Sequence, residues 1–137
     1  MYYGLRTQNR ELVRGETMET AVLIIQVVIA LGIFNVWVLR FGKSTEWRGG
    51  TAANMKEEFQ AYGLPSWSVQ VVGFLKLVFA ACLLAGIWIP TLTRPAAIGI
   101  AILMLAAVAM HLKVKDPLKK SLPALTMLLL SVIVAAS

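Results

Sequence analysis

Cysteine and histidine are almost absent from this chain of 137 residues: Cys82 and His111 are the only ones. A lone cysteine forms neither an intrachain disulfide nor a CxxC pair, so we expect no thiol–disulfide chemistry from the chain by itself. One cysteine and one histidine also fall short of the ligands of a zinc site. GxGxxG, P-loop, HExxH and GxSxG motifs are missing as well. We therefore predict no catalytic residues, no metal site and no enzyme activity of the chain on its own.

Charge is also scarce. Only 15% of the residues are charged and 58% are hydrophobic, whereas soluble domains average about 25% and about 45–50%. This composition indicates a membrane protein. The 13 Lys and Arg residues outnumber the 7 Asp and Glu residues, for a net charge of +6. The basic residues lie between apolar runs and form no recognition module, so we expect anionic lipid head groups, and no nucleic acid, as their partners.

Four apolar runs approach the length of about 20 residues that a membrane-spanning helix needs. They cover approximately residues 20–40, 67–89, 95–112 and 122–136. In lipid the backbone has to be hydrogen-bonded internally, so helices are expected. Short connections with prolines make the last three runs antiparallel neighbours. The predicted fold is an all-α membrane protein, a four-transmembrane-helix antiparallel bundle. For the short fourth run, a hairpin half lying in the membrane interface is the alternative interpretation.

The distribution of cations predicts an orientation. The second connection carries only Arg94, and the N-terminal segment adds three arginines. The first and third loops carry eight cations: Arg40, Lys43, Arg48, Lys56, Lys113, Lys115, Lys119 and Lys120. The positive-inside rule then places both loops in the cytoplasm and both termini outside. An interfacial aromatic belt is predicted near the ends of the runs, at Trp37, Trp67 and Trp88.

The first loop contains a candidate helix, Thr51–Tyr62. Met55, Phe59 and Tyr62 share one face of it, and Asn54 with Glu57 is typical of a capping box;. We predict an amphipathic interfacial helix against the mouth of the bundle. The alternative is a soluble loop helix that packs on nothing.

The first 17 residues are polar, and Met18 begins the apolar sequence METAVLII. A cleaved signal peptide is not expected, because no A-x-A site follows the apolar stretch. We interpret residues 1–17 either as a short tail or as an over-extended reading frame; in the second case translation starts at Met18. Residues 18–137 form the predicted transmembrane domain.

One charge lies inside an apolar run. Lys76 follows Trp67 by nine residues, which is about 13 Å of helix. Insertion scales assign about 2.5–3.5 kcal/mol to a lysine at the membrane centre. Gly73 and Ala80 on the same face are small, which favours contact with other helices. Lys76 therefore either holds an anionic or polar ligand, a proton or a partner acid, or it snorkels and only anchors the helix.

No Asp or Glu lies inside the four runs, so Lys76 has no acid partner at its own depth. Asn35 and Gln26 are nine residues apart and point to opposite sides of their helix, so at most one of them faces Lys76. We predict Asn35, because it is nearer the cytoplasmic end toward which Lys76 would snorkel. The other candidates are a ligand, Thr126, Ser131, Glu57 and Glu58.

His111 ends the third run and is predicted to carry a proton or donate to a ligand; the alternative is a polar residue that caps the helix C-terminus. The hypothetical ligand-binding set is Lys76, Asn35, His111 and Gly73. A second hypothetical set would contact lipid or a partner protein: Lys113, Lys115, Lys119, Lys120, Glu57 and Glu58. The alternative role of these lysines is to set the topology.

Three stretches, WRGGTAANMKEEFQAYGLPSW, GFLKLVFAACLLAGIWIP and MHLKVKDPLKKSLPALTMLLL, resemble the DoxX-like family of small bacterial membrane proteins. The resemblance covers about residues 18–137. It is most specific at Gly73, Lys76, Gly86, Pro90, His111 and the turn 116–118. It implies a four-helix bundle in the bacterial inner membrane. The wider group includes subunits associated with sulfur oxidation and quinone reduction, and members linked to oxidative-stress complexes.

Three functions remain open. The first is a non-catalytic subunit that binds a quinone or a lipid head group and supports a redox or stress-response membrane complex. The second is an assembly factor or structural partner of other membrane proteins. The third is a transporter of anionic or neutral small solutes. Small-xxx-small pairs at Ala81 with Ala85 and Cys82 with Gly86 suit helix packing within the chain or in a homo-oligomer.

Overall fold

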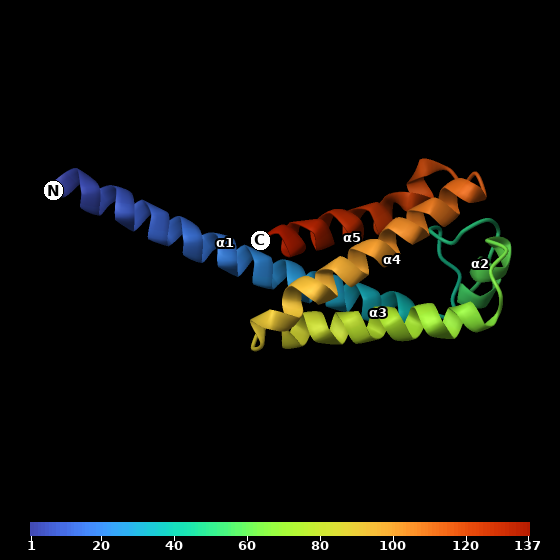
Figure 1. Ribbon diagram of the computed structural model, residues 1–137. Helices are drawn as coiled ribbons and strands as arrows, with labels where there is room; N and C mark the ends of the chain where they lie inside the picture. Colours follow the sequence, from blue (N-terminus) through green and yellow to red (C-terminus); the bar gives the residue numbers. More distant parts are fainter.

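The computed structural model describes residues 1–137 and is entirely helical (Figure 1). Its long helices are α1 (Tyr2–Phe34), α3 (Trp67–Ala85), α4 (Thr93–Lys113) and α5 (Leu118–Ala136), and the short α2 (Met55–Ala61) lies between α1 and α3. A π-helical turn, η1 (Asn35–Leu39), continues α1, and a 3-10 turn, η2 (Pro90–Leu92), precedes α4. Four helices are long and apolar enough to cross a membrane. The predicted four-helix membrane bundle is confirmed.

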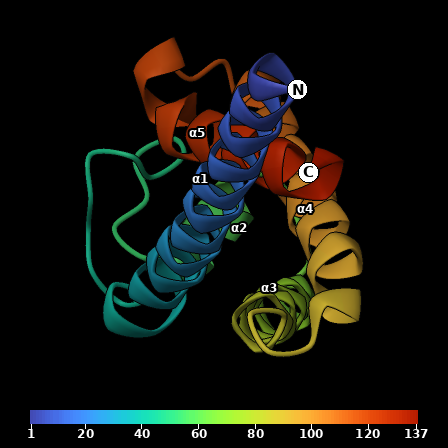
Figure 2. The ribbon, with the colours of Figure 1, turned by 90° about the vertical axis from the view of Figure 1, so that its left-hand side faces the viewer.

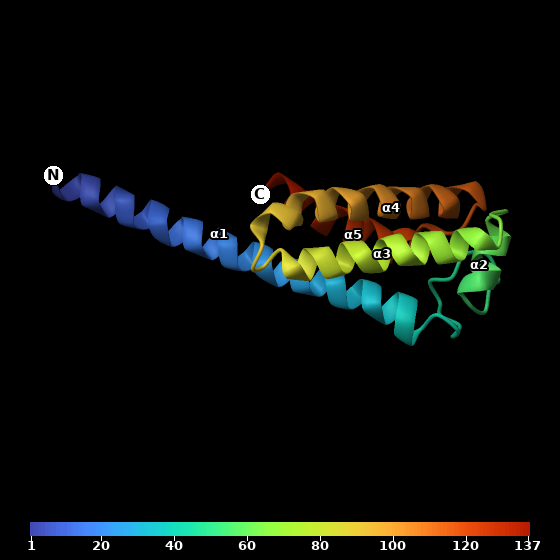
Figure 3. The ribbon, with the colours of Figure 1, turned by 60° about the horizontal axis from the view of Figure 1, so that its bottom comes forward.

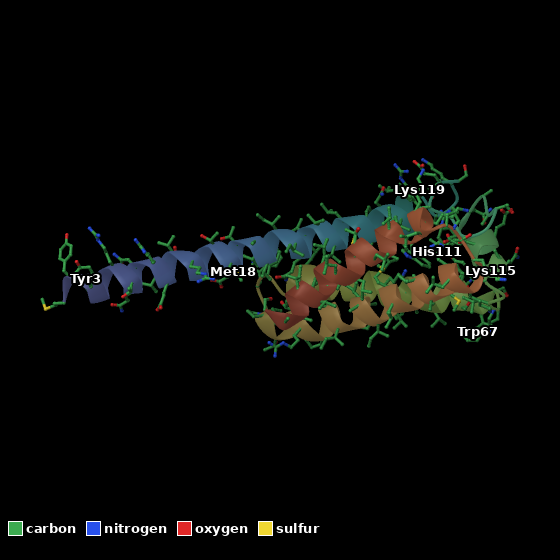
Figure 4. The ribbon with its side chains drawn as sticks, turned by 90° about the horizontal axis from the view of Figure 1, so that it is seen from above. Tyr3, Met18, Trp67, His111, Lys115 and Lys119 are labelled. Carbon is green, nitrogen blue, oxygen red and sulfur yellow. The ribbon has the colours of Figure 1, made fainter.

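Two helices begin earlier than the apolar runs predict. The first starts at Tyr2 rather than near residue 20, because the polar N-terminal segment contains no proline and continues the helix without a break. Every residue up to Ala21 is exposed, and Figure 4 shows Tyr3 far from the other helices. The last helix starts at Leu118 rather than at residue 122. Pro117, in extended conformation, stands directly before it, and Pro123 lies inside the helix.

The helices pack as neighbours in chain order. Helix α4 packs on α5 and on α3, and α1 packs on α3 and α5. Figure 3 shows α3, α4 and α5 running side by side, with α1 leaving the bundle toward its N-terminus. Figure 2 shows α3 and α4 on one side of α1 and the irregular part of the first loop (residues 40–66) on the other, with α2 behind α1. The core between the helices is apolar, with Ile29, Leu83 and Ile100 fully buried.

The bundle has two different ends. We call the end that carries the first loop and the α4–α5 turn (residues 114–117) the loop end, and the end that carries η2 the opposite end. At the opposite end, Gln26 of α1 is buried and its Nε2 donates to the carbonyl oxygen of Leu83 at 2.9 Å. Thr93 Oγ1 donates to the carbonyl of Gly86. A Cβ atom at Gly86 would lie 2.2 Å from this hydroxyl, so the close turn requires glycine.

Helix α2 covers the loop end. The Asn54 side chain accepts from the backbone N–H of Glu57 at 2.9 Å, and the Glu57 carboxylate accepts from the N–H of Ala53 at 2.7 Å, a capping box that reaches one residue further back than usual;. Met55 and Phe59 are buried against the bundle. The predicted amphipathic helix against the mouth of the bundle is therefore present, although it is shorter than predicted. The alternative, a loop helix that packs on nothing, is wrong.

Candidate functional site

A cavity of about 510 Å³ lies inside the loop end of the bundle. Its walls are mainly apolar and come from η1 with the end of α1, from α3, α4 and α5, and from the first loop with α2. The cavity is not sealed from the surface: five of its lining residues are exposed, namely Val36 of η1, Arg40 and Trp47 of the first loop, Ala106 of α4 and Pro123 of α5. Val36, Ala106 and Pro123 belong to helical segments that are long and apolar enough to cross a membrane.

Lys76 of α3 reaches this cavity. The residue is 8% exposed, and its ammonium makes no hydrogen bond and no ion pair with any protein group. The nearest feature is the ring of Trp37, whose centroid lies 5.2 Å from Nζ in a cation–π contact;. Because a buried ammonium has three donors, Lys76 presents unused hydrogen-bonding capacity to the cavity.

Trp37 lies in the π-helical turn η1 and corrects one sequence prediction. It was expected in an interfacial belt, but it is only 7% exposed and belongs to the core, whereas Trp67 and Trp88 are 65% and 78% exposed. Gly73 makes this burial sterically feasible, because a Cβ atom there would lie 2.8 Å from the indole. Gly73 thus contacts Trp37 rather than the cavity, and positions the ring beneath Lys76.

A buried ion pair joins two parts of the first loop. Arg48 is 5% exposed, and its Nη1 donates to Glu58 Oε2 at 2.9 Å. Its guanidinium also donates to the backbone carbonyls of Arg40, Phe41 and Lys43. All the hydrogen bonds of its guanidinium go to groups of the first loop itself, so Arg48 holds the loop in a fixed shape around the cavity.

Tyr62 connects this ion pair to α4. Its hydroxyl donates to Glu58 Oε1 at 2.7 Å and lies 3.4 Å from His111 Nε2. Burial, and then the neighbouring charge of Glu58, raise the pKa of the Tyr62 hydroxyl far above its ordinary value near 10. Tyr62 is therefore a neutral hydrogen-bond donor across the physiological range. Glu58, Tyr62 and His111 all line the cavity.

His111 continues the chain to the α4–α5 turn. Its Nδ1 lies 2.8 Å from Asp116 Oδ2, and the two side chains are 7% and 5% exposed. The Asp116 carboxylate also accepts from the backbone N–H of Gly50, at 3.1 Å and 3.3 Å from its two oxygens. Lys120 donates to the carbonyl of Gly50, and Lys113 donates to that of Tyr62 at 2.7 Å. These contacts tie the first loop to α4 and α5 at the end of the bundle where Figure 4 labels His111.

The residues predicted for a ligand site lie as follows. Lys76, Asn35 and His111 line the same cavity, without a hydrogen bond between them. Gln26 is at the opposite end, in line with the prediction that only one of the two amides is near Lys76. Thr126 is bonded to the carbonyl of Leu122 in its own helix.

The residues predicted to contact lipid or a partner fall into two groups. Glu57, Glu58, Lys113 and Lys120 make contacts within the chain. Lys115 and Lys119 are exposed, and Lys119 pairs with Glu46 on the surface. A role of these residues toward lipid or protein stays a prediction.

Sequence reasoning missed four members of the site: Trp37, Arg48, Tyr62 and Asp116. Arg48 was interpreted as a topology charge, Tyr62 as part of an apolar face and Asp116 only as part of the turn 116–118 on which the family resemblance rests. One feature of the sequence did point toward this site. No Asp or Glu lies inside the apolar runs, and Glu58 of the first loop was therefore among the candidate partners of Lys76. No group of three or more His, Cys, Asp or Glu side chains comes together to hold a metal ion.

Comparison with known proteins identifies the family. The chain matches the DoxX-like family over residues 24–134, and it therefore belongs to that family. The match includes all the cavity-lining residues described above. No curated protein sequence and no solved structure is significantly similar to the chain.

Proposed function

We propose that this DoxX-like membrane protein binds an amphipathic ligand, a quinone or a lipid head group, in the cavity at its loop end. In this proposal it serves as a non-catalytic subunit of a redox or stress-response complex in the bacterial inner membrane. The first loop and the α4–α5 turn face the cytoplasm, following the excess of cations that they carry.

The unpartnered ammonium of Lys76 carries the proposal. Helices in lipid bury charges only where a partner or a cavity receives them. Here the charge is buried, the only contact is a tryptophan ring, and the ammonium is directed into open volume. A quinone carbonyl or a phosphate oxygen would accept its hydrogen bonds, and a planar quinone would also contact the face of Trp37.

The shape of the cavity supports an amphipathic ligand. Apolar walls accommodate an isoprenoid or acyl chain, and few polar groups converge at one end, as in many small-molecule sites;. Val36 and Pro123 line the cavity and are exposed on membrane-spanning helices, which suits a molecule that enters from the lipid.

The decisive experiment compares wild type, Lys76→Met and Leu75→Met, extracted gently from a bacterial membrane. Leu75 lies on the exposed, lipid-facing side of α3 and serves as the matched control. Mass spectrometry identifies co-purifying quinones, lipids and proteins. A charge-assisted hydrogen bond contributes about 1.5–3 kcal/mol, so we expect at least about a tenfold loss of one quinone or anionic lipid in Lys76→Met only.

The opposite result has a clear meaning. Equal quinone and lipid content in all three proteins would show that Lys76 binds no such ligand. A protein that co-purifies equally with all three variants, without quinone or lipid, would favour the assembly role instead.

A further inference from the structure

The charged groups around the cavity are not balanced. Four cations line it and a fifth lies just outside the lining: Arg40, Arg48, Lys76 and Lys120, with Lys113. Only two carboxylates face them, Glu58 in the lining and Asp116 in contact with His111. The exposed pair of Lys119 and Glu46 adds no net charge. Positive charge is therefore in excess at the cavity, and a proton on His111 would only increase this excess.

Both carboxylates are already engaged by protein groups. They belong to a buried chain of polar groups in which every neighbouring pair is in contact: Asp116, His111, Tyr62, Glu58 and Arg48. Each oxygen of Glu58 accepts one hydrogen bond from a neighbour in this chain. Asp116 also accepts from the N–H of Gly50 and lies 3.9 Å from the ammonium of Lys120. No carboxylate is left to pair with the remaining cations.

The charged groups of Lys76 and Arg40 are the two in the lining that make no hydrogen bond or ion pair within the chain. Lys76 is almost fully buried inside the bundle, whereas Arg40 is exposed and therefore lies at the rim. The main chain of Arg40 is held in place, because its N–H donates to the carbonyl of Asn35 at 2.9 Å and its carbonyl accepts from Arg48. Its guanidinium is thus a free donor on a fixed backbone.

An anion would compensate both of these cations, and a neutral carbonyl would not. A quinone oxygen would accept a hydrogen bond from Lys76 but leave the buried positive charge without a counter-ion, which is costly among apolar helices. A phosphate monoester carries a charge of about −1.5 to −2 at pH 7 and three acceptor oxygens, which matches two unpaired cations. Arginine binds phosphate through its planar fork and lysine binds it as a point charge.

We propose that the cavity binds a phosphate monoester group between Lys76, inside the bundle, and Arg40, at the rim, and that Arg40 gives the site its preference for phosphate over neutral head groups. The attachment of this phosphate to an apolar chain rests on the proposed function; the pairing of positions 40 and 76 around one anion does not. A lipid with a terminal phosphate and a soluble phosphate ester share this chemistry.

Four probes separate the possible head groups and their sources. Dihexanoyl phosphatidic acid presents the monoester on short chains, dihexanoyl phosphatidylglycerol presents a diester, and a ubiquinone analogue with a short tail presents a neutral carbonyl. Glycerol 3-phosphate carries the monoester without a chain. Native mass spectrometry of the protein in a non-ionic detergent gives the Kd of each probe. We expect phosphatidic acid to bind at least about tenfold more tightly than the diester and the quinone, the effect of one additional charge-assisted hydrogen bond.

The variant Arg40→Gln tests the second cation, with Lys43→Gln as the matched control. Lys43 is an exposed cation of the same loop, and its carbonyl also accepts from Arg48, but it does not line the cavity. Arg40→Gln should weaken phosphatidic acid about tenfold and leave the quinone unchanged. Lys43→Gln should weaken phosphatidic acid by less than about threefold, because an exposed and distant charge is screened. Equal effects of the two variants would overturn the inference.

The remaining outcomes distinguish this inference from the proposed function. A quinone or diester that binds as tightly as phosphatidic acid, and is lost in Lys76→Met, would refute the phosphate assignment and leave the proposed function intact. Glycerol 3-phosphate that binds as tightly as phosphatidic acid, with the same loss in Arg40→Gln, would confirm the phosphate chemistry and refute the amphipathic ligand. Failure of all four probes to bind would refute both.

Discussion

The two ends of the bundle both bury polar side chains among apolar helices, but they differ in what is left unpaired: toward the opposite end only the neutral hydroxyl of Ser131 has no hydrogen-bond partner, whereas the loop end leaves a buried ammonium unpaired. At the opposite end, Gln26 donates to Leu83, and Thr93 donates to Gly86, in a tightly closed turn. At the loop end, Lys76 is almost as buried as Gln26 and has no acceptor, beside a cavity of about 510 Å³. The comparison separates a buried amide with a protein acceptor from a buried ammonium whose neighbour is a cavity.

The largest expected loss of stability comes from breaking the buried ion pair between Arg48 and Glu58 at the loop end. Arg48→Met removes the partner of Glu58 and leaves a buried carboxylate without its counter-ion, for an expected loss of about 3–5 kcal/mol in the free energy of unfolding;. Unfolding in mixed micelles with SDS measures this loss. The control Lys119→Met breaks an ion pair whose side chains are 62% and 64% exposed, and should cost less than about 0.5 kcal/mol;. Equal losses in both variants would contradict the assignment of Arg48.

At the opposite end we expect the substitution Gln26→Leu to cause a loss of stability of intermediate size. Gln26→Leu leaves the Leu83 carbonyl, in the last turn of α3, without its side-chain donor. An unsatisfied buried acceptor costs about 1–3 kcal/mol. The same unfolding assay applies, with Thr126→Val, which removes an exposed hydroxyl bonded within its own helix, as the control. A Gln26→Leu protein as stable as wild type would mean that the Gln26–Leu83 hydrogen bond is not needed for the scaffold, and the contrast between the paired amide and the unpaired ammonium would fail.

Alkaline pH is expected to weaken the loop end selectively. The pKa of Tyr62 is raised in the folded protein, so this hydroxyl keeps its proton above pH 10 while it ionises in the unfolded chain. The contribution of Tyr62 is thus fully present below pH 10, and stability falls by about 1.4 kcal/mol for each pH unit above it. Unfolding of wild type and Tyr62→Phe between pH 9 and pH 11 isolates this slope. Parallel pH profiles for the two proteins would show that Tyr62 ionises equally in both states.

The smallest expected change in stability belongs to the residue with the largest expected effect on binding. Lys76→Met gives up a cation–π contact of about 0.5–2 kcal/mol and also removes a charge that costs about 2.5–3.5 kcal/mol to insert. The ligand-free variant should therefore be as stable as wild type or more stable, by the same unfolding assay. Marked destabilisation would assign Lys76 to the scaffold, like Gln26.

Hydropathy and helix periodicity were sufficient for the fold and for parts of the site. Lys76 stood out because a lone charge in an apolar run is rare, and the buried face of α2 followed from the spacing of Met55, Phe59 and Tyr62. Trp37 was misassigned because its position near the end of a run is typical of an interfacial belt. Its burial depends on Gly73, which lies 36 residues away in the sequence and across a helix interface.

The chain of polar groups was beyond the reach of sequence patterns for a similar reason. Tyr62 and His111 are 49 positions apart, and Gly50 and Asp116 are 66 positions apart. Local patterns assign such residues to loops and turns, and only the packing of α4 and α5 on the first loop brings them together. The start of α1 at Tyr2 was missed because hydropathy reports the part of a helix that suits lipid, not where the helix begins.

The sequence separations within the loop end also imply an order of assembly. Arg48 and Glu58 are only ten positions apart and can pair as soon as the first loop has been synthesised. Tyr62 and Gly50 have to wait for His111 and Asp116, which arrive only after two further helices. Because a chain emerges from its N-terminus, the polar network closes last. A truncated or wrongly inserted chain would leave Tyr62 and Gly50 without these partners, so the complete network forms only after all four long helices are in place.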